Sequence, residues 1–170
     1  MEASPVIPDL GVCLGTRLQM TSLDPASPDA LRPGRRPRTT LSPTLVIDES
    51  GRAEMALGTP GGDKQDQWQL AFLVRHLQCG LSMQSAIDAP GFSSTHWPNS
   101  FFPRHAEPGA MRIEGRAGAD VLSELRARGH RVTCAEDWSE GWICATARKS
   151  DGTLSAAASP RGAQAYACGR

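Results

Sequence analysis

The sequence of 170 residues lacks any apolar run of the roughly 18 residues that a membrane-spanning helix requires. Residues 1–5 also lack the basic and apolar segments of a secretory signal peptide, which leaves both a cytoplasmic and a periplasmic location open. There is no excess of charge, because 18 basic residues balance 18 acidic ones. Nothing in the composition therefore indicates nucleic acid or a membrane as a partner.

The five cysteines lack the spacing of a metal site or a disulfide framework. Their number is odd, and no two have Cys-x-x-Cys spacing: Cys13, Cys79, Cys134, Cys144 and Cys168. Free or buried thiols in a reducing compartment are the preferred interpretation. His96 and His105 also share no metal-ligand spacing, so we expect structural roles for them. The sequence predicts no metal and no cofactor.

The length is sufficient for one domain with a hydrophobic core. The composition suits a loop-rich α/β protein, or part of one. Hydrophobic patterning predicts strands, helices and an irregular segment, rich in aromatics and prolines, over 91–110. The predicted strands cover 45–48, 53–58, 130–135, 141–148 and 153–158, and the predicted helices cover 64–79, 83–88 and 118–128.

Spacing within the helices predicts their buried faces and their caps. In the first helix the apolar residues at i, i+3, i+4 and i+7 are Leu70, Leu73, Val74 and Leu77, widened by Trp68, Ala71 and Phe72. Asp63 is the expected N-cap of this helix, and Ser82 that of the second. In the third helix the expected apolar face consists of Val121, Leu122 and Leu125.

The most informative stretch covers residues 36–64. Thr39, Thr40 and Ser42 supply three hydroxyls just before a predicted strand, and Gly61 and Gly62 form a turn just before a predicted helix. Backbone N–H groups in such a turn favour an anion or an oxyanion. A plain strand–turn–helix connection is the alternative. A nucleotide-binding P-loop is excluded, because Lys64 is not followed by Ser or Thr.

A basic cluster precedes this stretch. It consists of Arg32, Arg35, Arg36 and Arg38. A solvated loop is the preferred interpretation, because exposed charges usually contribute little, and a rim that attracts a carboxylate substrate is the alternative.

Several blocks resemble the small subunit of γ-glutamyltranspeptidases, which are N-terminal-nucleophile hydrolases. The blocks are Thr-Thr-Leu-Ser-Pro-Thr-Leu at 39–45, Gly-Thr-Pro-Gly-Gly at 58–62 and Gly-Leu-Ser-Met-Gln-Ser-Ala-Ile-Asp-Ala-Pro at 80–90. The similarity ends near Ser-Pro-Arg-Gly at 159–162 and so covers nearly the whole chain. Leu-Gly-Thr-Arg at 14–17 and the segment 61–69 resemble the branch that includes oxamate amidohydrolase and acylase-like members.

This resemblance implies a fold and a chemistry. The fold would be α+β and part of a four-layer αββα sandwich, with helices outside two stacked antiparallel sheets. An N-terminal threonine would attack an amide or γ-glutamyl carbonyl, with its own α-amine as the base and without a cofactor. The expected activity is that of a γ-glutamyltransferase-like amide hydrolase or acyltransferase, partnered by a large subunit cut from the same precursor. The alternatives are an oxamate amidohydrolase- or acylase-like enzyme without γ-glutamyl activity, or a non-catalytic binding or assembly module.

The resemblance also implies site residues. Gly61 and Gly62 match a pair whose N–H groups stabilise the oxyanion, and Thr39 and Thr40 match paired serines that bind the substrate carboxylate. Arg17 stands where the transpeptidases have a neutral or amide residue, and Met20 stands where they have an aspartate that pairs the substrate ammonium. Unless Arg17 points to solvent, we expect a substrate with a carboxylate and no α-ammonium.

The nucleophilic threonine of the resemblance would lie upstream of Gly11, where this sequence has no candidate. Removing Met1 would expose Glu2, which cannot act as the nucleophile. We therefore expect residues 1–170 to be a single domain that forms the C-terminal portion of a small subunit. By itself this portion would be inactive.

Overall fold

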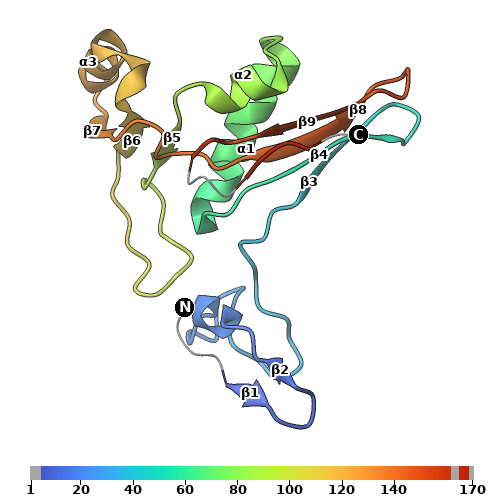
Figure 1. Ribbon diagram of the computed structural model, residues 1–170. Coiled ribbons are helices and arrows are strands. Elements are labelled where there is room, and N and C mark those ends of the chain that lie inside the picture. The colour runs from blue at the N-terminus through green and yellow to red at the C-terminus, as the bar shows by residue number, and fades with distance from the viewer. Residues whose placement is uncertain (1–4, 162–164, 169–170) are drawn as a thin grey trace.

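The computed structural model describes residues 5–161 and 165–168; the N-terminal residues considered above and Gly162 lie outside them. The described chain has three parts (Figure 1): an N-terminal unit, a four-stranded sheet covered by helices, and a three-stranded sheet with a helix of its own. Within these residues no helix is both long and apolar enough to cross a membrane.

The four-stranded sheet is antiparallel throughout, with strand order β3-β4-β8-β9. The strands are Thr44–Ile47, Ala53–Gly58, Cys144–Arg148 and Leu154–Ala158. The β3–β4 hairpin turns at Asp48, whose carboxylate accepts hydrogen bonds from the N–H groups of Ser50 and Arg52, both at 2.9 Å. All four strands are confirmed, although β8 begins later than predicted.

Helices α1 (Gln65–Leu73) and α2 (Met83–Asp88) cover one face of this sheet, and a π-helical turn (Val74–Gln78) extends α1. The strands contribute Met55, Leu57, Ala145 and Ala157 to the core, and the helices contribute Trp68, Phe72, Ala86 and Ile87. Ser82 caps α2, because its Oγ accepts a hydrogen bond from the N–H of Ser85 at 3.0 Å. This cap confirms the prediction.

The predicted apolar face of α1 is only partly correct: Trp68 and Phe72 are buried as predicted, and Leu73 packs against the core. Leu70 and Leu77 are 63% and 54% exposed, whereas the residues turned toward the sheet are Gln65, Trp68, Gln69 and Phe72. This set also follows i, i+3, i+4, i+7 spacing. The two buried glutamines bind the chain before β3: Ser42 Oγ donates to Gln65 Oε1 at 2.8 Å, and Gln69 Nε2 donates to the Ser42 carbonyl at 2.8 Å.

The other face of the four-stranded sheet is open. Leu45, Ile47 and Leu154 are 61%, 56% and 76% exposed. Small residues lie in register across its centre, and this face is hollowed by a cavity of about 570 Å³. Within the described residues no second antiparallel sheet covers it. The chain therefore supplies one helical layer and one sheet of a layered sandwich.

The three-stranded sheet consists of β5 (Phe92–Ser94), β6 (Ala110–Glu114) and β7 (Arg131–Ala135). The β6–β7 pair is parallel and is connected by α3 (Ala119–Ala127), so this sheet is mixed and is not the stacked antiparallel sheet of the expected sandwich. The prediction of irregular structure over 91–110 is wrong at β5. That strand is too short and polar to show alternation, and it is held by Gln67, whose Oε1 accepts from Ser94 N at 2.7 Å.

The predicted apolar face of α3 is only partly correct. Leu122 is 6% exposed and belongs to the buried residues, whereas Val121 is 43% exposed. Because Val121 adjoins Leu122 in sequence, the two lie about 100° apart around the helix and cannot share one narrow face. The helix therefore buries a narrower stripe than predicted.

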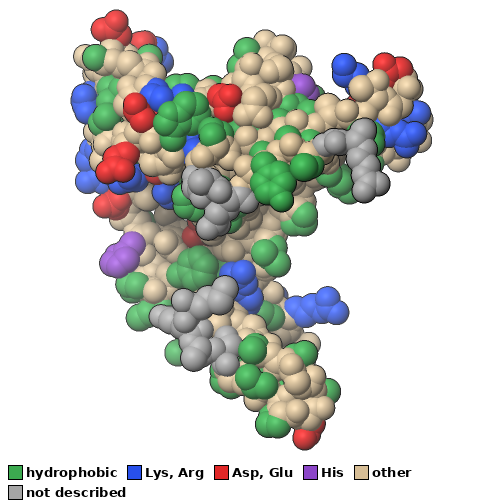
Figure 2. Space-filling view, viewed as in Figure 1, with side chains coloured by type: hydrophobic (Ala, Val, Ile, Leu, Met, Phe, Trp, Pro, Cys, Tyr) green, Lys and Arg blue, Asp and Glu red, His purple; other side chains and the backbone are tan. Residues whose placement is uncertain are grey.

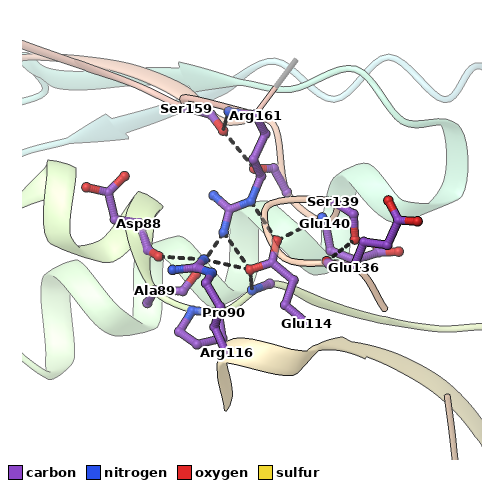
Figure 3. A network of polar contacts seen from close by, with 12 residues as sticks. Asp88, Ala89, Pro90, Glu114, Arg116, Glu136, Ser139, Glu140, Ser159 and Arg161 are labelled. Atoms are coloured by element: carbon purple, nitrogen blue, oxygen red, sulfur yellow. Dashed lines mark hydrogen bonds and ion pairs between the residues drawn. The ribbon is translucent and has the colours of Figure 1, made fainter. Parts of the chain in front are cut away.

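A buried ion-pair network joins the two sheets (Figure 3). Glu114 on β6 is fully buried, and its carboxylate receives Arg161 Nε at 2.8 Å and Arg116 Nη2 at 2.6 Å. The N–H groups of Gly91 and Glu140 also donate to it, each at 3.0 Å. Burial raises the pKa of Glu114, but these hydrogen bonds, led by that of Arg161, outweigh burial and lower the pKa to about 2.

The N-terminal unit, meaning the described residues before 31, contains β1 (Val6–Ile7), β2 (Val12–Cys13) and a 3₁₀ turn (Arg17–Met20). An extended segment over 31–43 connects it to β3 (Figure 1). Basic side chains are visible on this narrow connecting part of the molecule (Figure 2). The segment carries the exposed side chains of the basic cluster, which line a small cavity: Arg32, Arg35, Arg36 and Arg38. Arg32 Nη2 donates to the Pro25 carbonyl at 3.0 Å.

Candidate active site

The glycine turn, residues 61–64, follows β4 and leads into α1. Gly61 and Gly62 have φ values of +137° and +57°, which favour glycine. The N–H groups of these two residues donate to no acceptor within the described chain. They are therefore available to an external negative charge.

The indole of Trp68 lies directly beside this turn. A Cβ atom on Gly61 would lie 2.5 Å from Trp68 Cζ3, and one on Gly141 would lie 3.8 Å from Trp68 Cγ. Trp68 is 5% exposed, so it cannot move into solvent easily. Close packing thus explains glycine at position 61. It does not explain Gly62, where a Cβ would approach only Phe101 Cε2, at 3.5 Å.

The next two residues of the turn are bound from different sides. Asp63 does not cap α1 as predicted, because its carboxylate accepts hydrogen bonds from Ser100 instead, from the N–H at 2.7 Å and from the hydroxyl. Lys64 Nζ lies 3.2 and 3.3 Å from the two carboxylate oxygens of Glu140. The turn is therefore attached to two segments that are distant in sequence.

A cavity of about 760 Å³ lies against the glycine turn. Its opposite wall is the β5–β6 loop, residues 95–109, which contributes among others His96, Trp97, Asn99, Phe101 and His105; Arg38 also lines the cavity. His96 Nδ1 accepts a hydrogen bond from the N–H of Gly109 at 2.9 Å, as a structural histidine would. No group of three metal-ligating side chains occurs within residues 5–161 and 165–168.

The structure brings together some of the other predicted site residues. Arg17 Nη1 donates to Thr40 Oγ1 at 3.3 Å, and Thr39 Oγ1 accepts the N–H of Leu41 at 3.1 Å. Met20 is fully buried and lines no cavity described for this part of the chain. The cavity at Gly61 and Gly62 is lined by none of the other four predicted site residues, Arg17, Met20, Thr39 and Thr40. Within the described residues the predicted site therefore consists of two separate halves, the glycine turn and the group around Arg17.

The β5–β6 loop connects these halves, which the sequence did not indicate. Ser100 binds Asp63 of the glycine turn, and Arg104 Nη2 donates to the Met20 and Thr21 carbonyls at 2.9 and 3.3 Å. Asn99 Oδ1 accepts from the N–H of Phe101 at 2.6 Å, which is the local turn that an Asn in a loop favours. That Asn was the available signal that this loop is ordered.

Comparison with known proteins places these features in a family. The family model for γ-glutamyltranspeptidase matches residues 2–169. The chain belongs to the γ-glutamyltranspeptidase family. The oxamate amidohydrolase proenzyme of Klebsiella pneumoniae is 34% identical over 159 residues, which are 92% of this chain and 29% of that protein. The chain therefore spans less than a third of the length of this relative.

Solved structures share this fold. LmbA2991HD is 51% identical, with a TM-score of 0.90 over 99% of this chain and 30% of that chain. The γ-glutamyltranspeptidase of Pseudomonas nitroreducens is 22% identical, with a TM-score of 0.73 over 98% of this chain and 86% of that chain. The α+β fold is thus part of the four-layer sandwich of N-terminal-nucleophile hydrolases, as predicted. The names of the relatives include an amidohydrolase and an acylase.

Proposed function

We propose that this chain is part of an amide hydrolase or acyltransferase in which Gly61 and Gly62 form the oxyanion hole. The observation that carries the proposal is a pair of N–H groups that have no acceptor among residues 5–161 and 165–168 and lie in a glycine turn beside a cavity of about 760 Å³. Both N–H groups would donate hydrogen bonds to the negatively charged oxygen of a tetrahedral intermediate. One such donor is worth about 10² to 10³ in turnover.

The nucleophile in this proposal is a threonine at the N-terminus of a processed chain that includes these residues. Its Oγ attacks the amide carbonyl carbon while its α-amine takes the hydroxyl proton. The C–N bond then breaks, the leaving amine takes the proton, and an acyl-enzyme ester is left for water or an acceptor amine. A large subunit from the same precursor would complete the site, and the relative is itself named a proenzyme.

The substrate we propose carries a carboxylate and no α-ammonium group. Arg17 and Thr40, joined at 3.3 Å, and the nearby Thr39 supply donors for a carboxylate. Met20 offers no carboxylate to an ammonium and is buried. Oxamate, on which the Klebsiella relative acts according to its name, fits these donors. Glutathione and other γ-glutamyl compounds are the alternative substrates.

Turnover of three substrates by the full-length, processed enzyme tests this proposal. We expect a higher kcat/KM for oxamate and for a glutaryl amide than for glutathione. We also expect Arg17→Met to raise KM for oxamate by about 10-fold or more, since a charge-assisted hydrogen bond contributes about 1.5–3 kcal/mol. Arg17→Lys is the matched control, because it keeps the charge and loses only the planar fork.

Met20→Asp provides the reciprocal test. A gain of glutathione turnover in a folded variant would support the pocket inferred from this segment. Because Met20 is fully buried, a carboxylate at this position can destabilise the fold, so the thermal unfolding of the Met20→Asp variant must be recorded alongside its activity. A wild type that handles glutathione best would contradict the substrate assignment. If the full-length protein hydrolyses no amide and forms no acyl-enzyme, the result would support a binding or assembly module instead.

A further inference from the structure

We propose that Glu140 is a positioning residue for the oxyanion hole, acting through Lys64 on the glycine turn. This inference rests on the proposed function. Glu140 lies just before β8, and it is 76 residues from Lys64 in sequence. The carboxylate is fixed within the fold and the lysine belongs to the turn, so their contact sets where the N–H groups of Gly61 and Gly62 lie.

The Glu140 carboxylate is held in place from several sides. The residue is 2% exposed. Besides Lys64, it binds Ser93 Oγ at 2.8 Å and Arg112 Nε at 3.2 Å, and both of these partners belong to the three-stranded sheet. Its own N–H donates to Glu114 Oε1 at 3.0 Å within the buried network (Figure 3). Glu140 is thus a fixed point to which a neighbouring element can be attached.

The backbone around Glu140 is equally constrained. A Cβ on Gly91 would lie 2.0 Å from the Glu140 carbonyl oxygen, so the two segments pack without room for a side chain. Gly141 follows immediately and faces Trp68, the same indole that lies beside Gly61. The glycine turn and the segment at 140–141 therefore contact one shared side chain, and the Lys64–Glu140 pair links them a second time.

The glycine turn itself has few means of fixing its own position. The N–H groups of Gly61 and Gly62 are unpaired in the described chain. Two local backbone hydrogen bonds close the turn: Lys64 N donates to the Gly61 carbonyl at 3.1 Å, and Gln65 N donates to the Gly62 carbonyl. Asp63, bound to Ser100 at 2.7 Å, provides the second side-chain attachment. Displacements of about 1 Å at a catalytic group can cost about 100-fold in rate. An attachment at Lys64 thus has a direct consequence for catalysis.

Arg112 provides a matched control for Lys64. Both cations lie 3.2 Å from Glu140 Oε1, but Arg112 belongs to β6, and its side-chain hydrogen bond in the described part of the chain is to Glu140 and not to the glycine turn. Lys64→Met and Arg112→Met therefore remove one charge each from the same carboxylate. If the ion pairs of Glu140 contribute only to general stability, the two variants should have similar kcat values. If Lys64 positions the glycine turn, only Lys64→Met should lower kcat.

The test compares kcat, KM and thermal unfolding of these variants in the full-length, processed enzyme. We expect Lys64→Met to lower kcat by about 10-fold or more with little change in KM, and Arg112→Met to leave kcat within about 2-fold. Equal losses of kcat, or a Lys64→Met loss confined to KM, would overturn the proposal, the latter because it would indicate direct substrate binding.

Glu140→Gln adds a double-mutant cycle. If Lys64 acts through Glu140, the loss in Lys64→Met should be nearly as large as the loss in the double variant; additive losses would contradict the proposal. A readout without activity is hydrogen exchange at the Lys64 and Gln65 amides. We expect Lys64→Met, but not Arg112→Met, to accelerate it. If Lys64→Met accelerates exchange but the wild type hydrolyses no amide, the attachment of the turn would stand and the proposed function would be refuted. If Lys64→Met leaves exchange unchanged, the attachment itself would be refuted.

Discussion

A methyl group added at Gly61 should destabilise the protein far more than the same group at Gly62. The two glycines are adjacent, and both have positive φ values, +137° and +57°. Their surroundings differ, however. The new Cβ would lie 2.5 Å from Trp68 Cζ3 at position 61, but no nearer than 3.5 Å to Phe101 Cε2 at position 62.

The expected costs follow from these two environments. At Gly61 the unfavourable φ costs about 1–3 kcal/mol. Displacement of a well-packed indole adds about 1–3 kcal/mol, so Gly61→Ala should lose about 2–6 kcal/mol in total. At Gly62 the backbone is close to the left-handed helical region, where Ala costs about 1–2 kcal/mol and no packing term is added.

Thermal and denaturant unfolding of Gly61→Ala and Gly62→Ala in the full-length protein measure this difference. We expect Gly61→Ala to be less stable than Gly62→Ala by at least about 1 kcal/mol, the lower limit of the packing term. Trp68→Phe should recover part of the loss in Gly61→Ala, because it removes the atoms that the methyl group meets. Equal stability of the two variants would show that Trp68 does not constrain this turn.

Three further predictions follow from other contacts. Gly62→Val should lower turnover by about 100-fold or more with a smaller change in KM, measured by steady-state kinetics; near-normal turnover would make the glycine pair a structural turn only. The pKa of Glu114 is about 2, against 4.5 for the free side chain. The ionised Glu114 therefore stabilises the folded protein above pH 4.5, and the free energy of unfolding should fall by up to about 3 kcal/mol as the pH falls toward 2. Urea unfolding over this range should show that loss in the wild type and not in Glu114→Gln, and a parallel pH dependence would contradict it. Gln69→Leu should lower stability by about 1–3 kcal/mol, because it removes the hydrogen bonds of Gln69 to Thr44 Oγ1 and to the Ser42 carbonyl and leaves these two groups only their long mutual bond at 3.4 Å; unchanged unfolding would refute that role.

The sequence was sufficient for the strands of the antiparallel sheet and for the positions of the helices. It was not sufficient for the face that α1 buries. Leucines at 70 and 77 and glutamines at 65 and 69 occupy equivalent helical spacings, and hydrophobicity alone selects the leucines. The glutamines are buried because Ser42 and Thr44 offer them hydrogen bonds from a distant segment. Such partners are set by tertiary contacts, which a pattern of single residues does not contain.

The same limit applies to the candidate site. Gly61 and Gly62 could be singled out because positive φ is a local property that glycine makes visible in the sequence. Asp63 was assigned the wrong role, because an Asp before a helix is most often its cap, and only the fold brings Ser100 to it. Lys64 and Glu140 are likewise paired across 76 residues. The residues that shape the turn were therefore predictable, whereas the residues that hold it were not.

The β5–β6 loop determines how the two halves of the proposed site can act together. Ser100 fixes one end to the glycine turn at 2.7 Å, and Arg104 fixes the other to the Met20 carbonyl at 2.9 Å. Met20 ends the 3₁₀ turn that carries Arg17, so movement of this loop would shift the proposed carboxylate donor relative to the proposed oxyanion donors. A substrate that must contact both at once would be discriminated by its length between carboxylate and amide. If the proposed site acts in this way, we expect substrate length, besides charge, to separate oxamate from longer acyl amides.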